Sequence, residues 1–128
     1  MVDVVAALIT AGDRFLICRR PEGKKRGLLW EFPGGKIENG ETPEQALIRE
    51  CREELNVTVD PHGIFSSVVY SYPDITVRLT VYKTELVSGT PELLWHSDLK
   101  WISSDEIDEY DFCPADVDIL EKIKNSLL

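Results

Sequence analysis

The fold of this chain is decided by the stretch Gly34-Gly35-Lys36-Ile37-Glu38-Asn39-Gly40-Glu41-Thr42-Pro43-Glu44-Gln45-Ala46-Leu47-Ile48-Arg49-Glu50-Cys51-Arg52-Glu53-Glu54-Leu55-Asn56-Val57, a glycine-rich loop followed by an acidic segment. Thr42 suits an N-cap, Pro43 suits the first helical position, and Gln45 completes a capping box, so a helix is predicted to begin at Pro43. It is predicted to end near Leu55, because Asn56 tolerates the left-handed conformation of a C-cap.

Three carboxylates lie on one face of this predicted helix, because Glu50, Glu53 and Glu54 have the spacing i, i+3, i+4. A solvated acidic face, helped by an ion pair between Arg49 and Glu53, is the ordinary explanation of such a pattern. The preceding Gly34-Gly35 favours a second explanation, since glycine lets backbone carbonyls approach whatever the carboxylates bind. Carboxylate and carbonyl oxygens are the ligands that Mg²⁺ and Mn²⁺ prefer.

The whole stretch resembles the Nudix box, the signature of hydrolases acting on nucleoside diphosphates linked to another group. Gly35, five residues, Glu41, seven residues and the run from Arg49 to Val57 carry the resemblance. Two positions depart from the pattern: Cys51 replaces a bulky aliphatic residue, and Asn56 replaces a glycine. Neither is a ligand position, so the metal site is expected to be retained.

The resemblance implies an enzyme, a metal-dependent hydrolase that converts a nucleoside triphosphate to the monophosphate and pyrophosphate in nucleotide-pool sanitation. The implied cofactor is Mg²⁺, with Mn²⁺ as the alternative, held by Glu50, Glu53, Glu54 and the carbonyl of Gly34. Glu50 or Glu53 would take the proton of the attacking water, and Arg49 would orient a carboxylate. Two alternatives stay open: hydrolysis of another nucleoside diphosphate derivative, such as a nucleotide sugar, and a non-catalytic module that senses a nucleotide.

Length and charge limit the other possibilities. The chain has 128 residues and 43% hydrophobic content, which predicts one globular domain over residues 1–128. Its net charge of −9 argues against binding a nucleic-acid polymer and leaves a small nucleotide as the expected partner. Residues 1–9 predict a buried strand, neither a signal peptide nor a membrane span. Cys18, Cys51 and Cys113 lack metal or disulfide spacing, so reduced thiols and a cytoplasmic location are expected. The expected oligomeric state is a monomer or homodimer.

Candidate nucleotide contacts lie before the box. Arg20 follows a predicted strand at 14–19, and in MutT-type Nudix enzymes an arginine at this place contacts the nucleotide. Glu31 and Phe32 belong to a Glu-Phe-Pro-Gly run that lines the nucleotide pocket in those enzymes. Strand alternation places Trp30 and Phe32 on one face and Glu31 on the other. The basic loop 21–27 between them is predicted to be solvated, with contact to phosphates as the alternative.

One expected carboxylate is missing near the end of the chain. Relatives commonly carry a Glu-His pair about six residues before a tryptophan, and the glutamate can act as a further metal ligand or base. Here His96 and Trp101 match, but Trp95 occupies the glutamate position. Unless Glu92 or Asp98 substitutes for it, the base must come from the helix.

Asp116 is the fourth candidate for nucleotide binding. It is an ordinary first-turn acid of a helix, or it reads the base, because the matching position in the MutT enzyme that clears oxidised guanine nucleotides is a base-reading asparagine. A cytidine-nucleotide group instead has the Pro-Ala-Asp found here. An ionised aspartate only accepts hydrogen bonds, as the amino group of cytosine requires, whereas oxidised guanine requires a donor and an acceptor. A protonated Asp116 could donate if burial or Glu31 raised its pKa, so 8-oxo-guanine and cytosine both stay open.

The fold implied by the resemblance is an α/β Nudix fold, an α/β/α sandwich in which a mixed sheet lies between the Nudix-box helix and a C-terminal helix. The alternation and turn residues predict strands at 2–10, 14–19, 57–60, 64–72 and 75–86. The terminal helix is predicted to reach about Asn125, with an apolar stripe of Val117, Leu120, Ile123 and Leu127.

Overall fold

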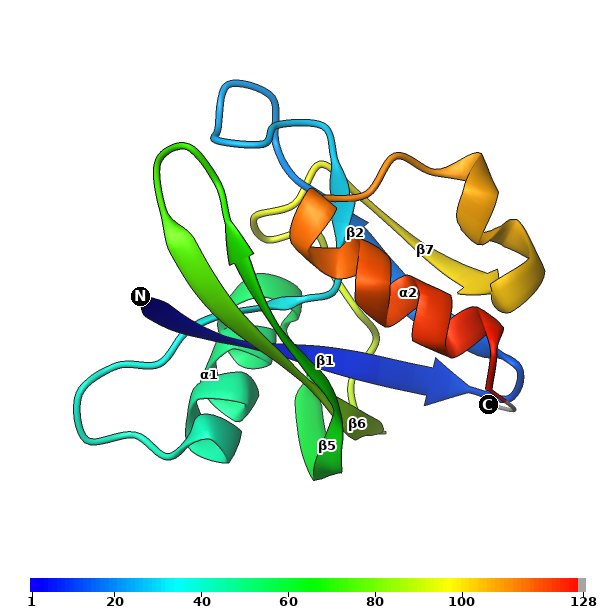
Figure 1. Ribbon diagram of the computed structural model, residues 1–128. Coiled ribbons are helices and arrows are strands. Elements are labelled where there is room, and N and C mark those ends of the chain that lie inside the picture. Colours follow the sequence, from blue (N-terminus) through cyan, green and yellow to red (C-terminus); the bar gives the residue numbers. More distant parts are fainter. Residues whose placement is uncertain (127–128) are drawn as a thin grey trace.

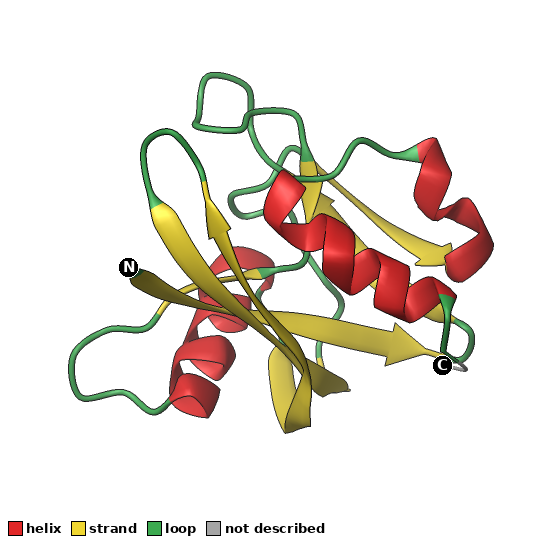
Figure 2. Cartoon of the chain, viewed as in Figure 1, coloured by secondary structure: helices red, strands yellow, loops and turns green. Residues whose placement is uncertain are grey.

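Strand β1 (Val2–Ala11) is the central strand of the computed structural model, which describes residues 1–126. The other strands are β2 (Arg14–Arg19), β3 (Trp30–Glu31), β4 (Gly34–Lys36), β5 (Thr58–Ser71), β6 (Thr76–Ser88) and β7 (Asp98–Ser103). The helical elements are α1 (Pro43–Leu55), the 3₁₀ helices η1 (Ser104–Glu109) and η2 (Pro114–Asp116), and α2 (Val117–Lys124). Figure 2 shows the strands between the two α-helices.

The sheet is mixed, because β1 has both parallel and antiparallel neighbours. β6 runs parallel to β1 along Val2 to Ile9. β4 pairs antiparallel with the first half of β1, and β2 returns antiparallel to its end. The strand order is β3-β2-β1-β6-β5, with β4 also beside β1 and β7 also beside β2.

Alternate residues of β1 supply apolar side chains to both faces of the sheet. Val5, Ala7 and Ile9 pack in the core cluster under α1, and Ala6 and Leu8 pack in the cluster under α2. A strand buried on both faces reads as a continuous apolar run, as β1 does. The two helices therefore cover opposite faces of the sheet (Figure 1), and the predicted α/β/α sandwich is confirmed.

The ends of α1 are those that the sequence predicts. The Thr42 hydroxyl accepts a hydrogen bond from the backbone N–H of Gln45, and the Gln45 side chain accepts one from the N–H of Thr42. At the other end, Asn56 is left-handed, with φ of 53°, and its N–H donates to the carbonyl of Arg52. The capping box and C-cap thereby satisfy backbone groups that a helix leaves unpaired at its ends.

One predicted pair of strands is a single strand. β5 runs without a break from Thr58 to Ser71, where strands at 57–60 and 64–72 were predicted, and its register against β6 shifts between Pro61 and Ile64. β5 is at the edge of the sheet, where a bulge and a proline are tolerated because no further strand needs the N–H groups. Pro61 and Gly63 therefore bend the strand without ending it.

The terminal helix differs in its apolar stripe. Residues 114–116 form the 3₁₀ helix η2, and Val117 at the start of α2 is 46% exposed. Ile119 is buried instead, together with Leu120 and Ile123. The prediction for Val117 is therefore wrong, and Leu127 lies outside the described residues.

Two expectations concern the cysteines and the membrane. All three cysteines are buried and unpaired, as predicted. Burial raises the pKa of the Cys51 thiol to about 12, so this side chain packs as an apolar group in the core under α1. Among residues 1–126, no helix has the length and apolar character needed to cross a membrane.

Candidate active site

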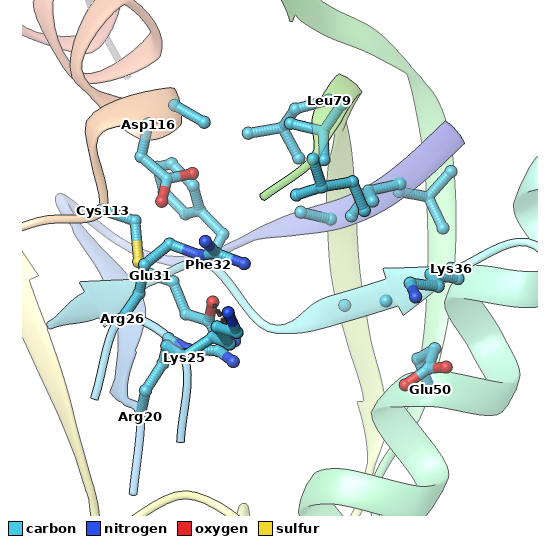
Figure 3. A pocket seen from close by; sticks show the side chains of 18 of the residues that line it. Arg20, Lys25, Arg26, Glu31, Phe32, Lys36, Glu50, Leu79, Cys113 and Asp116 are labelled. Atoms are coloured by element: carbon cyan, nitrogen blue, oxygen red, sulfur yellow. Dashed lines mark hydrogen bonds and ion pairs between the residues drawn. The ribbon is translucent and has the colours of Figure 1, made fainter. Parts of the chain in front are cut away.

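A cavity of about 460 Å³ opens between α1, the edge of β4, the β5–β6 hairpin and η2. Its size falls in the range of small-molecule sites. Seven of the predicted site residues line it, namely Arg20, Glu31, Phe32, Gly34, Glu50, Glu54 and Asp116. Figure 3 shows Glu31, Phe32 and Asp116 gathered at one end of the cavity and Glu50 at the other. Arg49 and Glu53 are on the same helix as Glu50 but are not among the residues that line the cavity.

The two glycines of the loop allow two different close approaches. A Cβ atom on Gly34 would lie 2.0 Å from the carbonyl oxygen of Val5, so only glycine lets β4 pair with β1 here. A Cβ atom on Gly35 would lie 2.4 Å from Cδ of Glu50. Gly35 thus makes room for a carboxylate of α1 directly against the backbone of β4.

Arg49 connects the loop to the helix. Its guanidinium binds both carboxylate oxygens of Glu41, at 2.7 and 3.0 Å, and donates to the carbonyl of Lys36 at 3.1 Å. The same group donates to Glu50 at 2.8 Å and lies 3.3 Å from Glu53. The hydrogen bonds from Arg49 lower the pKa of Glu41, and Glu41 is the main cause of the raised pKa of Arg49. The network holds the loop and two helix carboxylates in one arrangement.

Glu50 and Glu54 are the two half-buried carboxylates of α1. Burial raises the pKa of Glu50, against the effect of its bond from Arg49. Burial also raises the pKa of Glu54 to about 8, and the nearby negative charges of Glu31 and Glu50 add to the shift. The N–H of Gly34 donates to Glu54 at 3.2 Å, and this hydrogen bond offsets only part of the rise in the pKa. Without a counter-charge it is unfavourable to ionise both carboxyl groups here, which fits residues that hold a divalent cation.

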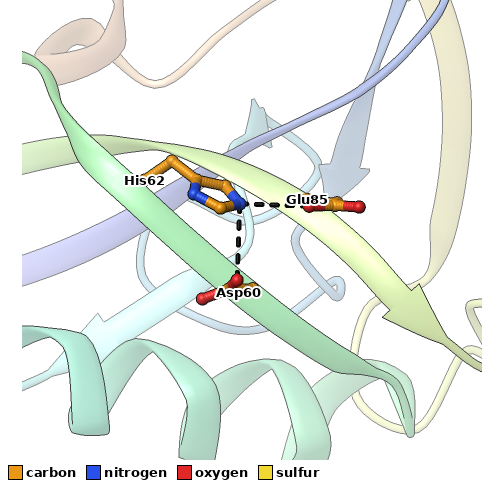
Figure 4. A group of neighbouring side chains, drawn as sticks. All are labelled: Asp60, His62 and Glu85. Carbon is orange, nitrogen blue, oxygen red and sulfur yellow. Dashed lines mark hydrogen bonds and ion pairs between the residues drawn. The ribbon is translucent and has the colours of Figure 1, made fainter.

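The third carboxylate of the helix, Glu53, is turned to solvent, with 59% of its side chain exposed. Within residues 1–126, the three helix carboxylates do not form a compact group. The only three His, Cys, Asp or Glu side chains whose ligand atoms lie within 4.8 Å of one another are Asp60, His62 and Glu85. They are exposed on β5 and β6 (Figure 4), where the His62 ring bridges the directly opposed carboxylates of Asp60 and Glu85. This bridge accounts for the group as a cross-strand ion-pair cluster.

The opposite end of the cavity is organised by Glu31. Arg20 donates to one oxygen of Glu31 at 3.1 Å, and Nε2 of His96 lies 2.9 Å from the other. Trp30 and Phe32 are both buried in the core under α2, while Glu31 lies beside Arg20 at the cavity. The predicted alternation is therefore confirmed, although the edge of Phe32 still reaches the cavity wall.

Asp116 is buried, with 4% of its surface exposed. Burial raises the pKa of Asp116 well above its usual value, and nearby Glu31 raises it further while Arg20 opposes the shift. The residue ends η2 and is the N-cap residue of α2, but its side chain makes no capping hydrogen bond. Its carboxyl group lines the cavity, where a neutral acid can both donate and accept a hydrogen bond.

Three residues that line the cavity, Arg26, Tyr72 and Asp74, were not predicted as site residues from the sequence. Arg26 stacks 4.2 Å from the ring centre of Tyr72 and pairs with Asp74 at 3.1 Å, across the mouth of the cavity. Arg26 therefore holds the loop 21–27 against the β5–β6 hairpin (Figure 1), while residues 22–25 are exposed, as predicted for a solvated loop. The Tyr72 hydroxyl accepts a hydrogen bond from the N–H of Ala115, at 2.9 Å. The only signal for these residues was the basic composition of the loop, which names no partner.

The residues considered as replacements for the missing glutamate have other contacts. Glu92 accepts a hydrogen bond from the Asn56 side chain at 2.6 Å. Asp98 accepts one from the N–H of Leu99, within β7. Trp95 lines the cavity. Among the described residues, the carboxylates of α1 are therefore the acidic groups at the end of the cavity where Glu50 lies.

Comparison with known proteins agrees with this geometry. The model of the NUDIX domain family matches residues 4–122. The chain is 35% identical over 121 residues to the CTP pyrophosphohydrolase of Escherichia coli (strain K12), covering 94% of this chain and 90% of that protein. It is 33% identical over 120 residues to the 8-oxo-dGTP diphosphatase of the same organism, covering 94% and 93%.

A solved structure shares the architecture over almost the whole chain. The crystal structure of the MutT protein from Methanosarcina mazei Go1 superposes with a TM-score of 0.87 at 26% identity, covering 97% of this chain and 93% of that one. The mixed sheet and the two helices that cover it are therefore features of a shared fold. Together with the family match, they show that the chain belongs to the Nudix family, among its MutT-like hydrolases.

Proposed function

We propose that the chain hydrolyses a nucleoside triphosphate to the monophosphate and pyrophosphate, as part of nucleotide-pool sanitation. The observation that carries this proposal is that one cavity has helix carboxylates at one end and Asp116 at the other. A nucleotide matches this arrangement, because its polyphosphate would lie at the carboxylate end and its base beside Asp116. The net charge of −9 supports a small substrate over a nucleic-acid polymer.

The metal belongs at the carboxylate end. Nudix hydrolases generally need a divalent metal, and we assign Mg²⁺, with Mn²⁺ as the alternative, to Glu50, Glu53, Glu54 and the Gly34 carbonyl. When bound, the cation would neutralise the phosphates and lower the pKa of the attacking water. The raised pKa values of Glu50 and Glu54 support this assignment, because two partly buried carboxylates need a compensating positive charge.

Three residues of α1 divide the work of proton transfer. Glu50 or Glu53 accepts the proton of the attacking water. Arg49, which binds both of them, orients the carboxylates and also binds Glu41 in the loop. Glu50 is held against Gly35, whereas 59% of the Glu53 side chain is exposed, so the two candidates differ in their exposure to solvent.

The nucleotide is bound at the other end by Arg20, Glu31, Phe32 and Asp116. A neutral Asp116 offers one donor and one acceptor, as an asparagine does. Cytosine presents an N4–H donor beside the N3 acceptor, and oxidised guanine presents N–H donors beside its oxygen acceptors. The geometry therefore supports both bases that the sequence left open, an 8-oxo-guanine and a cytosine nucleotide.

The proposal extends to the setting of the enzyme. Three buried, unpaired cysteines support a cytoplasmic location. We propose a monomer or homodimer as the oligomeric state.

The decisive experiment is a panel of canonical, methylated and oxidised nucleoside triphosphates incubated with Mg²⁺, with products separated by ion exchange. Monophosphate and pyrophosphate are expected. Release of orthophosphate, or turnover of nucleotide sugars alone, would contradict the proposed reaction. Glu53→Gln should lower kcat by at least about 100-fold if Glu53 is a ligand or base, and unchanged turnover would remove it from the site.

A further inference from the structure

Trp95 and His96 are consecutive residues that contact the two partners of one ion pair. The ion pair joins Arg20 and Glu31 at 3.1 Å, and both side chains are less than one-fifth exposed. The Arg20 guanidinium lies 5.1 Å from the ring centre of Trp95. Nε2 of His96 lies 2.9 Å from the Glu31 oxygen that Arg20 does not bind. One dipeptide therefore holds a cation with its first residue and an anion with its second.

The Arg20 side chain depends on Trp95 for one side of its support. Its Nε donates to the carbonyl of Lys25 at 2.8 Å, and its Nη1 donates to Glu31. These bonds fix the edge of the guanidinium, while the face of a planar cation is fixed by stacking. The indole of Trp95 supplies that face and is 37% exposed at the cavity wall.

His96 fixes the orientation of the other partner. Its side chain is fully buried, and within residues 1–126 Glu31 is its only polar contact, since Nδ1 has no partner. The Trp95 and His96 rings meet edge to face with centres 4.8 Å apart, so each ring packs against the other. The backbone is anchored as well, because the N–H of Ser97 donates to the carbonyl of Arg19 at 2.9 Å.

We propose that Trp95 is a positioning residue that sets nucleotide affinity and base preference by holding Arg20 in its place beside Glu31. The inference rests on the proposed function for the identity of the ligand. In this chain the loop position beside the metal end carries an indole directed at the nucleotide end, so the loop contributes to substrate selection. A nearby residue of the same loop, Leu94, is 56% exposed and is absent from the cavity lining, which makes it a matched control.

A double-mutant cycle on binding tests the proposal. Dissociation constants for CMP and 8-oxo-dGMP are measured by calorimetry in EDTA, for wild type, Trp95→Ala, Arg20→Ala and the double variant. Trp95→Ala should weaken binding by about 3- to 30-fold, the range of a cation–π contact. Trp95→Phe should restore most of the loss, and Leu94→Ala should have no effect. In the double variant, Trp95→Ala should add nothing to the effect of Arg20→Ala.

Two results would overturn the proposal. Additive effects in the double variant would mean that Trp95 acts independently of Arg20, for example by touching the nucleotide itself. Equal binding by Trp95→Ala and wild type would mean that Trp95 plays no part in binding. Thermal unfolding of each variant without ligand confirms that it is folded before the comparison.

Turnover measurements separate this proposal from the proposed reaction. In the triphosphate assay with Mg²⁺, Trp95→Ala should raise KM and leave kcat within about twofold, because the metal end is untouched. A fall in kcat at unchanged KM would contradict a positioning role at the nucleotide end. A wild type that hydrolyses no triphosphate would contradict the proposed function alone, since the monophosphate cycle in EDTA requires neither metal nor turnover.

Discussion

Gly35 lies directly against the carboxylate of Glu50, where a Cβ atom would come within 2.4 Å of Cδ and 2.6 Å of both oxygens. The neighbouring Gly34 meets backbone instead, since its Cβ would lie 2.0 Å from the Val5 carbonyl oxygen. A side-chain end can move aside, whereas paired backbone cannot. The two glycines therefore serve different purposes: Gly34 allows β4 to pair with β1, and Gly35 makes room for Glu50 in the active site.

Gly35→Ala should displace the Glu50 carboxylate and lower kcat/KM by about 10- to 100-fold, the cost of a small misplacement at a reacting centre. Its melting temperature should fall only slightly. Gly34→Ala is the matched contrast and should lose stability markedly, because the clash is with β1. In a Glu50→Ala background, Gly35→Ala should have no further effect on activity. A further loss there would show that Gly35 acts by another route.

Arg49→Lys should impair activity although the charge is retained. Lysine cannot bind both oxygens of Glu41 while also reaching Glu50 and the Lys36 carbonyl. We expect at least a tenfold fall in kcat/KM (about 1.4 kcal/mol) and a lower melting temperature. Arg52→Lys is the control, since Arg52 is exposed and contacts only Thr58 among the described side chains. Equal kcat/KM and equal melting temperatures for the two variants would show that the contacts of the Arg49 guanidinium are not needed.

Much of the metal end could be predicted from the sequence because its structure is local. The capping box of Thr42 and Gln45 and the C-cap at Asn56 depend on residues a few positions apart, and all appear as predicted. The i, i+3, i+4 spacing predicted three carboxylates on one face of the helix, and two of them, Glu50 and Glu54, line the cavity. Spacing alone could not show that Glu53 is exposed while Glu54 is half-buried, because burial depends on what the loop and sheet place against each side chain.

The nucleotide end was predicted less completely because its contacts are distant in sequence. His96 and Glu31 are 65 residues apart, and Arg26 and Asp74 are 48 apart. No periodicity links such pairs, and only the pairing of β2 with β7 and the return of the β5–β6 hairpin bring them together. The resemblance supplied Arg20, Glu31, Phe32 and Asp116, but it contained no signal for Tyr72 or for the support given by Trp95.

Glu54 gives a pH dependence whose sign can be worked out. Its pKa rises on folding from 4.5 to about 8, so the folded protein without metal loses stability as pH increases over that interval. Glu54→Gln does not titrate and should melt at a higher temperature than wild type, with a difference that grows from pH 4.5 to about 8 and then levels. Thermal unfolding in EDTA measures this difference. A constant difference over the interval would contradict the raised pKa.

Metal binding should show the opposite preference, because a cation competes with the proton on Glu54. Mg²⁺ affinity, measured by calorimetry, should increase as pH approaches and passes about 8. Glu53→Gln is a useful comparison, since it removes an exposed carboxylate and keeps the buried one. It should weaken binding at every pH and retain the pH dependence, whereas Glu54→Gln should remove most of it. If Mg²⁺ affinity depended on pH as steeply in Glu54→Gln as in wild type, the titrating group would not be Glu54.

Asp116 predicts a second pH dependence, at the nucleotide end. Burial and nearby Glu31 raise its pKa, so it is a neutral donor and acceptor below that pKa and an acceptor only above it. Binding of 8-oxo-dGMP in EDTA should therefore weaken as pH rises through the pKa of Asp116. Asp116→Asn, which keeps one donor and one acceptor, should bind with little change over the same range. The ratio of the two dissociation constants at each pH cancels the titration of the ligand and of Glu54, and a ratio independent of pH would exclude Asp116 as the titrating group that reads the base.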